Sequence, residues 1–232
     1  MIQAQEEALR SAARTRLLSL ALARPTGESL ARLARLAEAL KEEELAEAAA
    51  AADPEELGGE YERLFGSDGI VPPYEGDYAR DPFRRTRLLA DVAGFYRAFG
   101  AEAGGPEGER PDHAGCELEF LAFLALLRRE RLEQGDEAGA EICARAEDAF
   151  LRDHLGGWLP LLLAEVEREA SEPLYRAASR AGARLLAREL AERGLEVALA
   201  EGRKAGLRSG VEEDELSCGD LCAPRPSQER TR

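Results

Sequence analysis

Apolar side chains recur every three to four residues through most of this 232-residue chain, and proline or glycine separates one run from the next. Alanine, leucine, glutamate and arginine dominate the composition, whereas β-branched residues are scarce, so intrinsic propensity also favours helix. We find no convincing strand pattern and no internal repeat. The sequence therefore predicts an all-α fold, with about seven to nine helices in a single compact bundle-like domain.

The boundaries of the expected helices come from their start and stop signals. They cover residues 4–23, 28–40 with an extension or restart in the alanine run 48–52, 54–65, 83–100, 111–134, 136–170 with a break at 154–158, and 173–202. The first helix should face the core with four apolar residues, Leu9, Ala13, Leu17 and Leu20. Because periodicity fades after Gly202, we expect residues 1–208 to form the helical domain and residues 209–232 to form a flexible tail that is acidic and contains proline.

The net charge of −15 argues against nucleic acid or an anionic membrane as a partner, because both would repel such a surface. The acid is clustered, with ten Asp or Glu residues and one lysine between Glu38 and Glu62, which we interpret as a solvent-exposed helix face. The N-terminus shows no signal-peptide pattern, and no apolar run approaches the ~18–20 residues of a membrane span. We therefore expect no membrane insertion, a cytoplasmic location and reduced cysteines.

All aromatic residues, including the tryptophan, lie between Tyr61 and Tyr175, so this span should form most of the core. Within it, residues 67–82 form a long proline-rich segment with little periodicity. Loops of this length inside a compact domain are often functional. Its prolines restrict the backbone, and Tyr74 and Tyr78 offer amphipathic contact surface. We therefore expect this loop either to contribute to a binding site or to serve as an ordered connector.

A second stretch, 109–121, holds a concentration of polar chemistry at an expected helix start. Pro111 suits the first position of a helix, and Asp112 would lie at the positive end of the helix dipole. His113 and Glu117 are four residues apart and would share one face of the helix. We therefore expect the first turn to hold Asp112, His113 and Glu117 together.

Five ordered segments resemble the TorD/DmsD/NarJ family of chaperones, which assemble molybdenum-cofactor oxidoreductases. The matching residues are Tyr61, Leu64 and Phe65; Pro72, Pro73, Tyr74, Glu75 and Tyr78; Phe95, Tyr96, Phe99 and Gly100; Glu109, Pro111, Asp112, His113, Glu117, Leu118 and Phe120; and, in the C-terminal half, Phe150, Leu151, His154, Leu155, Trp158, Pro173 and Tyr175. They span about Tyr61 to Leu190, whereas the first sixty residues and the tail carry no such match.

The resemblance implies a cytoplasmic, non-enzymatic chaperone that binds the apo catalytic subunit of a molybdopterin oxidoreductase, including its twin-arginine leader peptide, as a monomer or homodimer. The client site that it implies comprises Pro72, Pro73, Tyr74, Glu75, Tyr78, Glu109, Asp112, His113 and Glu117. Carboxylates in such a site could pair with leader arginines through charge-assisted hydrogen bonds. No cofactor or metal of its own is expected.

Three alternatives stay open at this point. The client could be an enzyme that is not exported, as for a NarJ-like assembly factor. Asp112, His113 and Glu117 could be acid–base residues of a helical enzyme, or metal ligands together with His154. Asp112 and Glu117 could instead orient His113 by hydrogen bonds and so fix a junction between a helix and a loop.

Overall fold

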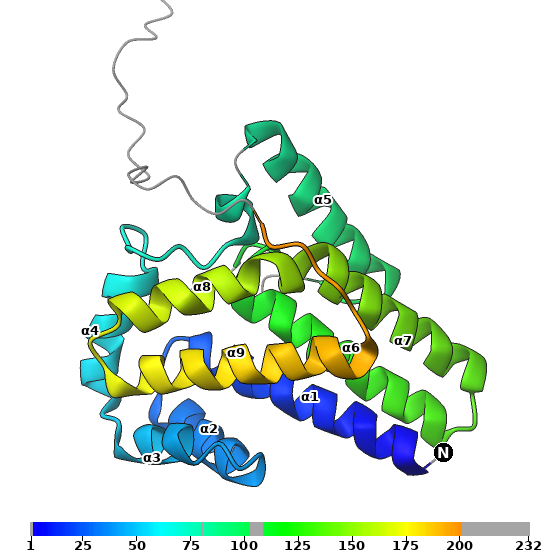
Figure 1. The fold of residues 1–232 in the computed structure, drawn as a ribbon, viewed down its shortest axis with the longest axis horizontal. Helices are drawn as coiled ribbons and strands as arrows, with labels where there is room; N and C mark the ends of the chain where they lie inside the picture. The colour runs from blue at the N-terminus through cyan, green and yellow to red at the C-terminus, as the bar shows by residue number, and fades with distance from the viewer. Residues whose placement is uncertain (1, 80, 103–108, 201–232) are drawn as a thin grey trace, which may run out of the picture.

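The computed structural model describes residues 2–79, 81–102 and 109–200, and these residues form an all-α domain (Figure 1). Its elements are α1 (Ile2–Leu22), α2 (Gly27–Ala39), α3 (Glu43–Ala51), α4 (Pro54–Phe65), the 3₁₀ turn η1 (Glu75–Tyr78), α5 (Pro82–Ala98), α6 (Ala114–Glu133), α7 (Glu137–Phe150), the π-helical turn η2 (Leu151–Leu155), α8 (Gly156–Glu169) and α9 (Pro173–Arg193). The all-α prediction is confirmed. The expected tail, 209–232, lies outside the described residues.

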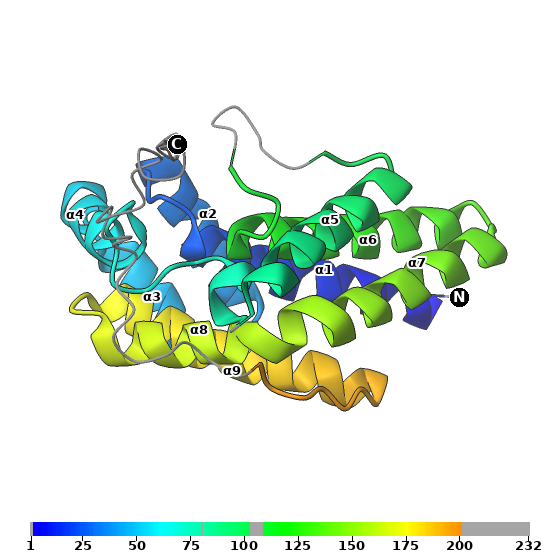
Figure 2. The same ribbon diagram turned by 90° about the horizontal axis from the view of Figure 1, so that it is seen from above.

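The long helices pack in two layers (Figures 1 and 2). Helices α1 and α6 lie antiparallel at the rear, and α8 and α9 lie side by side at the front. Helices α2 to α4 close one end of the bundle, α7 packs against α6, and α5 lies across the top. None of the described helices is long and apolar enough to cross a membrane.

Several helix ends lie where their capping residues predict. Asp53 accepts hydrogen bonds from the backbone N–H groups of Glu55 and Glu56 at the start of α4, and Asp136 does the same for Gly139 in α7. Gly135, with φ of 74°, follows the end of α6. The alanine run is a restarted helix, α3, because the chain turns at Lys41, where φ is 61°. The last helix ends earlier than expected, at Gly194 (φ 65°), and residues 195–200 return in an irregular segment.

Most buried hydrophobic residues lie between Tyr61 and Tyr175, as predicted, and leucines and alanines of α1 to α4 and of the later part of α9 complete the core. The expected inward face of α1 is partly wrong, because Leu9 is 44% exposed whereas Ala8, Ala12 and Leu18 are buried. The buried face of α1 is therefore rotated from the stripe that its leucines alone would predict, because alanines form part of that face.

The break expected at 154–158 is present as the π-helical turn η2, directly before α8. A Cβ on Gly156 would come 2.5 Å from the carbonyl oxygen of Leu151, so a side chain here would clash with the widened turn. The returning segment packs on this point, where the Ala200 N–H donates to the Gly157 carbonyl at 2.8 Å.

The acidic run 38–62 is more than a solvated face. Glu44 pairs with Arg180, and Glu42 pairs with Arg184 at 2.6 Å, so both carboxylates join the N-terminal helices to α9. Glu60 is buried and receives two hydrogen bonds from Arg63 and one from the Ser171 backbone. The expectation of a solvent-exposed face is therefore wrong for the buried Glu60 and for the partly buried Glu42, whereas Glu44 is exposed as expected.

A buried ionic cluster joins the two ends of the described chain. Arg14 of α1 donates to Glu189 of α9 at 2.7 Å, and Glu189 also accepts from Ser11 at 2.9 Å. Arg193 reaches Glu189 at 3.3 Å and Asp148 of α7 at 2.7 Å, and it also pairs with Glu147. Burial raises the pKa of Glu147, and the nearby guanidinium of Arg193 opposes that rise. The cluster fixes α1, α7 and α9 relative to one another.

Candidate functional site

The proline-rich loop and the stretch before α6 meet along their backbones. Tyr74 and His113 form an antiparallel bridge, the Glu75 N–H donates to the Asp112 carbonyl at 2.9 Å, and the Ala114 N–H donates to the Pro73 carbonyl at 2.8 Å. The two segments are 36 residues apart in sequence but act as one unit. We call this unit, residues 72–78 with 109–117, the junction.

Helix α6 begins at Ala114, so the expectation of a helix start at Pro111 is wrong. His113 is the N-cap, and its Nδ1 accepts a hydrogen bond from the Gly115 N–H at 3.0 Å. Its other ring nitrogen, Nε2, therefore carries the proton in the neutral ring. Burial lowers the pKa of His113, although the charges of Glu109 and Asp112 oppose that change. His113 is thus a neutral capping residue here, in a role that Ser, Thr, Asp or Asn usually fills.

Asp112 lies at the centre of the junction and is fully buried. Its Oδ2 accepts from the Gly76 N–H at 3.1 Å, and its carboxylate receives two bonds from Arg110, at 3.0 and 2.8 Å. A Cβ on Gly76 would come 3.0 Å from Asp112 Oδ2, so this approach leaves little room for a side chain. Asp112 therefore organises the loop and does not orient His113 as one alternative expected.

The outer rim of the junction is formed by Tyr74, Glu109 and Arg110. The Arg110 guanidinium lies 4.4 Å from the centre of the Tyr74 ring, and the Tyr74 hydroxyl donates to Glu109 at 3.0 Å. Burial and this carboxylate raise the pKa of Tyr74 to about 12. Tyr74 and Glu109 are half-buried and Arg110 is exposed, so this rim faces solvent.

The inner side of the junction is a buried polar cluster. His154 Nδ1 of η2 lies 3.0 Å from Glu75 Oε2, and the Trp158 indole N–H donates to Glu117 Oε2 at 3.2 Å. Burial raises the pKa of Glu117 well above its usual range, and the neighbouring charge of Glu75 raises it further. Both effects favour the protonated carboxyl over the carboxylate at Glu117. The cluster ties the junction to η2 and α8.

Aromatic packing holds the junction against the helices around it. The Tyr78 and Trp158 rings lie 5.4 Å apart, and the Tyr96 hydroxyl of α5 donates to the Pro111 carbonyl at 2.8 Å. Burial raises the pKa of Tyr96, so it stays a neutral donor. The structure thus brings the whole proposed set together, but it buries Pro73, Glu75, Tyr78, Asp112, His113 and Glu117.

Sequence reasoning did not assign roles to Arg110, Tyr96 and Trp158, although all three contact the junction directly. Arg110 stands between two acids of the motif, which is a usable signal, but nothing in the sequence pairs Trp158 with Glu117. The alternative metal set is not assembled, since His154 pairs with Glu75. Among the described residues, no group of three His, Cys, Asp or Glu side chains is placed to hold a metal ion.

Comparison with known proteins shows which family this chain matches and which proteins it resembles. The family model described as "Nitrate reductase delta subunit" matches residues 32–164. The chain is 38% identical over 109 residues to the selenate reductase assembly chaperone protein of Thauera selenatis, covering 46% of this chain and 55% of that protein. It is 36% identical over 124 residues to the chlorate reductase assembly chaperone protein of Ideonella dechloratans, covering 52% of this chain and 62% of that protein.

A third relative is the dimethyl sulfide dehydrogenase assembly chaperone protein of Rhodovulum sulfidophilum, 36% identical over 121 residues, covering 51% of this chain and 42% of that protein. The matches thus span roughly half the length of these curated relatives. The fold is similar to a crystal structure from Archaeoglobus fulgidus described as a "putative redox enzyme maturation protein". Its TM-score is 0.53 at 23% identity, covering 76% of this chain and 93% of that one. Because the family model covers more than half of the sequence and includes the whole junction, the chain belongs to the nitrate reductase delta subunit family.

Proposed function

We propose that this protein is a chaperone that binds the apo catalytic subunit of a molybdenum-cofactor oxidoreductase and assists its assembly. The observation that carries the proposal is the match to three assembly chaperones of oxidoreductases, at 36–38% identity. A binding role also fits the chemistry of the junction, because both histidines are buried and each has a ring nitrogen engaged by a neighbouring group. We therefore assign no catalytic residue.

The client contact in this proposal is the solvent-facing rim of the junction. Tyr74 and the half-buried Pro72 supply apolar surface, and Glu109 supplies a carboxylate. The exposed Asp91 of α5 stands close by, 3.6 Å from His154 Nε2. An apolar surface beside carboxylates is what a leader with two arginines and an apolar stretch requires. The buried members of the set would act indirectly, by holding the rim in place.

Calorimetric titration with a synthetic twin-arginine leader peptide tests this contact. The matched control is the same peptide with both arginines replaced by glutamine. We expect binding of the first peptide and at least about a tenfold weaker affinity for the second, because charge-assisted hydrogen bonds are lost. Equal affinity for the two peptides would contradict recognition of the arginines.

The assembly role is tested separately in the native host. Deleting the gene should lower both the molybdenum content and the activity of the client reductase while its polypeptide is still made. Fractionation of the client then separates chaperoning of an exported enzyme from chaperoning of one that stays in the cytoplasm. A fully loaded and active reductase in the deletion strain would overturn the proposal.

A further inference from the structure

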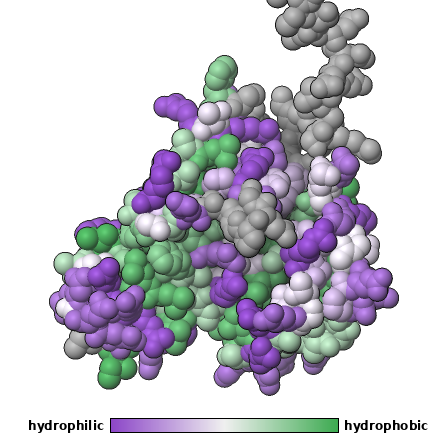
Figure 3. All heavy atoms as spheres, turned by 180° about the vertical axis from the view of Figure 1, so that it is seen from behind, coloured by the Kyte–Doolittle hydropathy of each residue, from purple (hydrophilic) through white to green (hydrophobic). Residues whose placement is uncertain are grey.

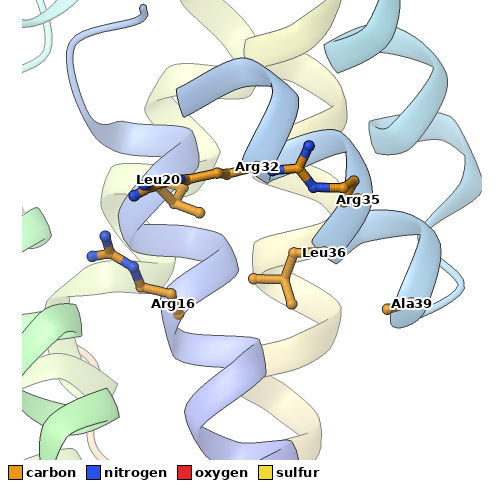
Figure 4. A pocket seen from close by; sticks show the side chains of 6 residues that line it. All are labelled: Arg16, Leu20, Arg32, Arg35, Leu36 and Ala39. Carbon is orange, nitrogen blue, oxygen red and sulfur yellow. The ribbon is translucent and has the colours of Figure 1, made fainter. Parts of the chain in front are cut away.

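A hollow of about 350 Å³ opens between α1 and α2, away from the junction (Figure 4). Its residues are apolar at the floor and basic at the edge, namely Leu20, Leu36, Ala39, Arg16, Arg32 and Arg35. Viewed from behind, apolar residues also gather over α1 and α6, next to this hollow (Figure 3). Three arginines around one hollow are a local exception in a chain of net charge −15.

The arginines of this hollow are only weakly engaged. Arg16 pairs with Glu119, and Arg32 pairs with Glu28 at 2.5 Å, with both partners largely exposed. Arg35 is exposed and has no ion-pair partner among the described residues. Exposed pairs of this kind contribute about 0–1 kcal/mol each. A denser set of carboxylates could therefore compete for all three guanidinium groups.

We infer that this hollow binds residues 211–216 of the same chain, Val-Glu-Glu-Asp-Glu-Leu. This segment carries four consecutive carboxylates between two apolar residues, Val211 and Leu216. The carboxylates complement the arginine edge, and the apolar ends suit the floor of the hollow. The inference does not depend on the proposed client, because it concerns a contact within one chain.

A short stretch of chain tethers this segment to the described domain. Ala200, the last described residue, is held on Gly157, and ten residues separate it from Val211. Ten extended residues reach up to about 35 Å. A tether of this kind gives an effective concentration in the millimolar range, so a weak contact suffices for occupancy.

Disulfide trapping in the full chain tests the contact. Ala39→Cys introduces a thiol at the hollow, and Cys222→Ser leaves Cys218 as the tail thiol. Ile142→Cys, on the exposed face of α7, is the matched control in the same background. Under mild oxidation, we expect the 39–218 disulfide to form roughly tenfold faster than the 142–218 disulfide, with the products identified by peptide mass spectrometry.

Two charge changes make the test specific to the proposed contact. Arg32→Glu with Arg35→Glu, or conversion of the four tail acids to their amides, should each lower the 39–218 rate to that of the control. About 0.5 M salt should lower it as well. Equal rates at the two positions, or a rate unaffected by both charge changes, would overturn the inference. Disulfides that form only between two chains would also overturn it, in favour of a second copy as the occupant.

Discussion

Asp112 and Glu109 belong to the same junction but differ in exposure. We therefore assign a structural role to Asp112 and a binding role to Glu109. Asp112 is fully buried and receives bonds from Gly76 and Arg110, whereas Glu109 is half-buried and accepts from Tyr74. We expect Asp112→Asn to destabilise the fold by about 1–3 kcal/mol, because a buried charge-assisted contact is lost. That corresponds to a melting temperature lower by roughly 3–10 °C, which thermal unfolding would measure.

Glu109→Gln is the paired variant, since an amide oxygen can still accept from Tyr74. Its melting temperature should stay close to that of the parent protein. Its affinity for the twin-arginine leader peptide should fall about tenfold, through the loss of one charged partner. If Asp112→Asn weakened binding while leaving the melting temperature unchanged, Asp112 would be a contact residue and the assignment above would be wrong.

Glu117 makes the stability of the protein depend on pH. Its pKa is raised in the folded state by burial, so its stabilising effect is complete below the unfolded pKa and is lost as pH rises towards the folded pKa. Glu117→Gln keeps the acceptor for Trp158 and removes the proton dependence. We expect its melting temperature to exceed the parent's by about 3 °C or more at pH 8 and to converge with it near pH 4.5.

Glu130→Gln serves as the control for that measurement, because Glu130 lies on the same helix and is exposed. Its melting curve should follow the parent's at every pH. A Glu117→Gln variant with the same pH slope as the parent would show that Glu117 is not the group responsible.

At the scale of elements, replacing either of two helical glycines by alanine should change the stability of the fold, but in opposite directions. A Cβ on Gly182 of α9 would come 2.9 Å from Leu18 of α1 and 3.0 Å from Leu163 of α8, whereas nothing lies within 4 Å of one on Gly94 in α5. Gly182→Ala should therefore cost about 1–3 kcal/mol by overpacking, and Gly94→Ala should add about 0.5–1 kcal/mol through helix propensity. Thermal unfolding of both variants measures this; a stabilised Gly182→Ala would show that the three helices separate easily.

Helix positions were predictable from the sequence to the extent that their signals are local. Asp53 and Asp136 mark the starts of α4 and α7, because N-capping is a local interaction that needs no tertiary contact. The start of α6 was not predictable in this way, because Pro111 and Asp112 are recruited by the loop at 72–78, 36 residues away. The same limit applies to the site, since motif spacing located the junction but could not show that Asp112 and Glu117 face inward.

For the whole molecule, we expect the tail to contribute little to folding. Truncation after Gly206 should lower the melting temperature by about 2 °C or less, since the docking inferred above involves solvent-exposed charges. Differential scanning calorimetry of the full and truncated chains measures this. A fall of ten degrees would mean that the tail belongs to the folded core.

We also expect the purified protein to hold no stoichiometric transition metal. His113 Nδ1 already accepts a backbone hydrogen bond and His154 Nδ1 is engaged by Glu75, so each histidine has one ring nitrogen committed to the fold. Elemental analysis of protein prepared without an affinity tag measures this. One equivalent of bound metal would favour the enzyme alternative over the chaperone.

The buried ionic cluster that joins α1 to α9 has a consequence for how this protein is made. Arg14 leaves the ribosome early, but its partner Glu189 follows 175 residues later. At about 5–20 residues per second, the delay is roughly 9–35 s. During that interval the first helix lacks its charge partner, and its apolar face lacks α6 for the first part of the interval and α9 for all of it. A protein proposed to shelter unfinished enzymes thus passes through an unfinished state of its own, which ends only when α9 is released.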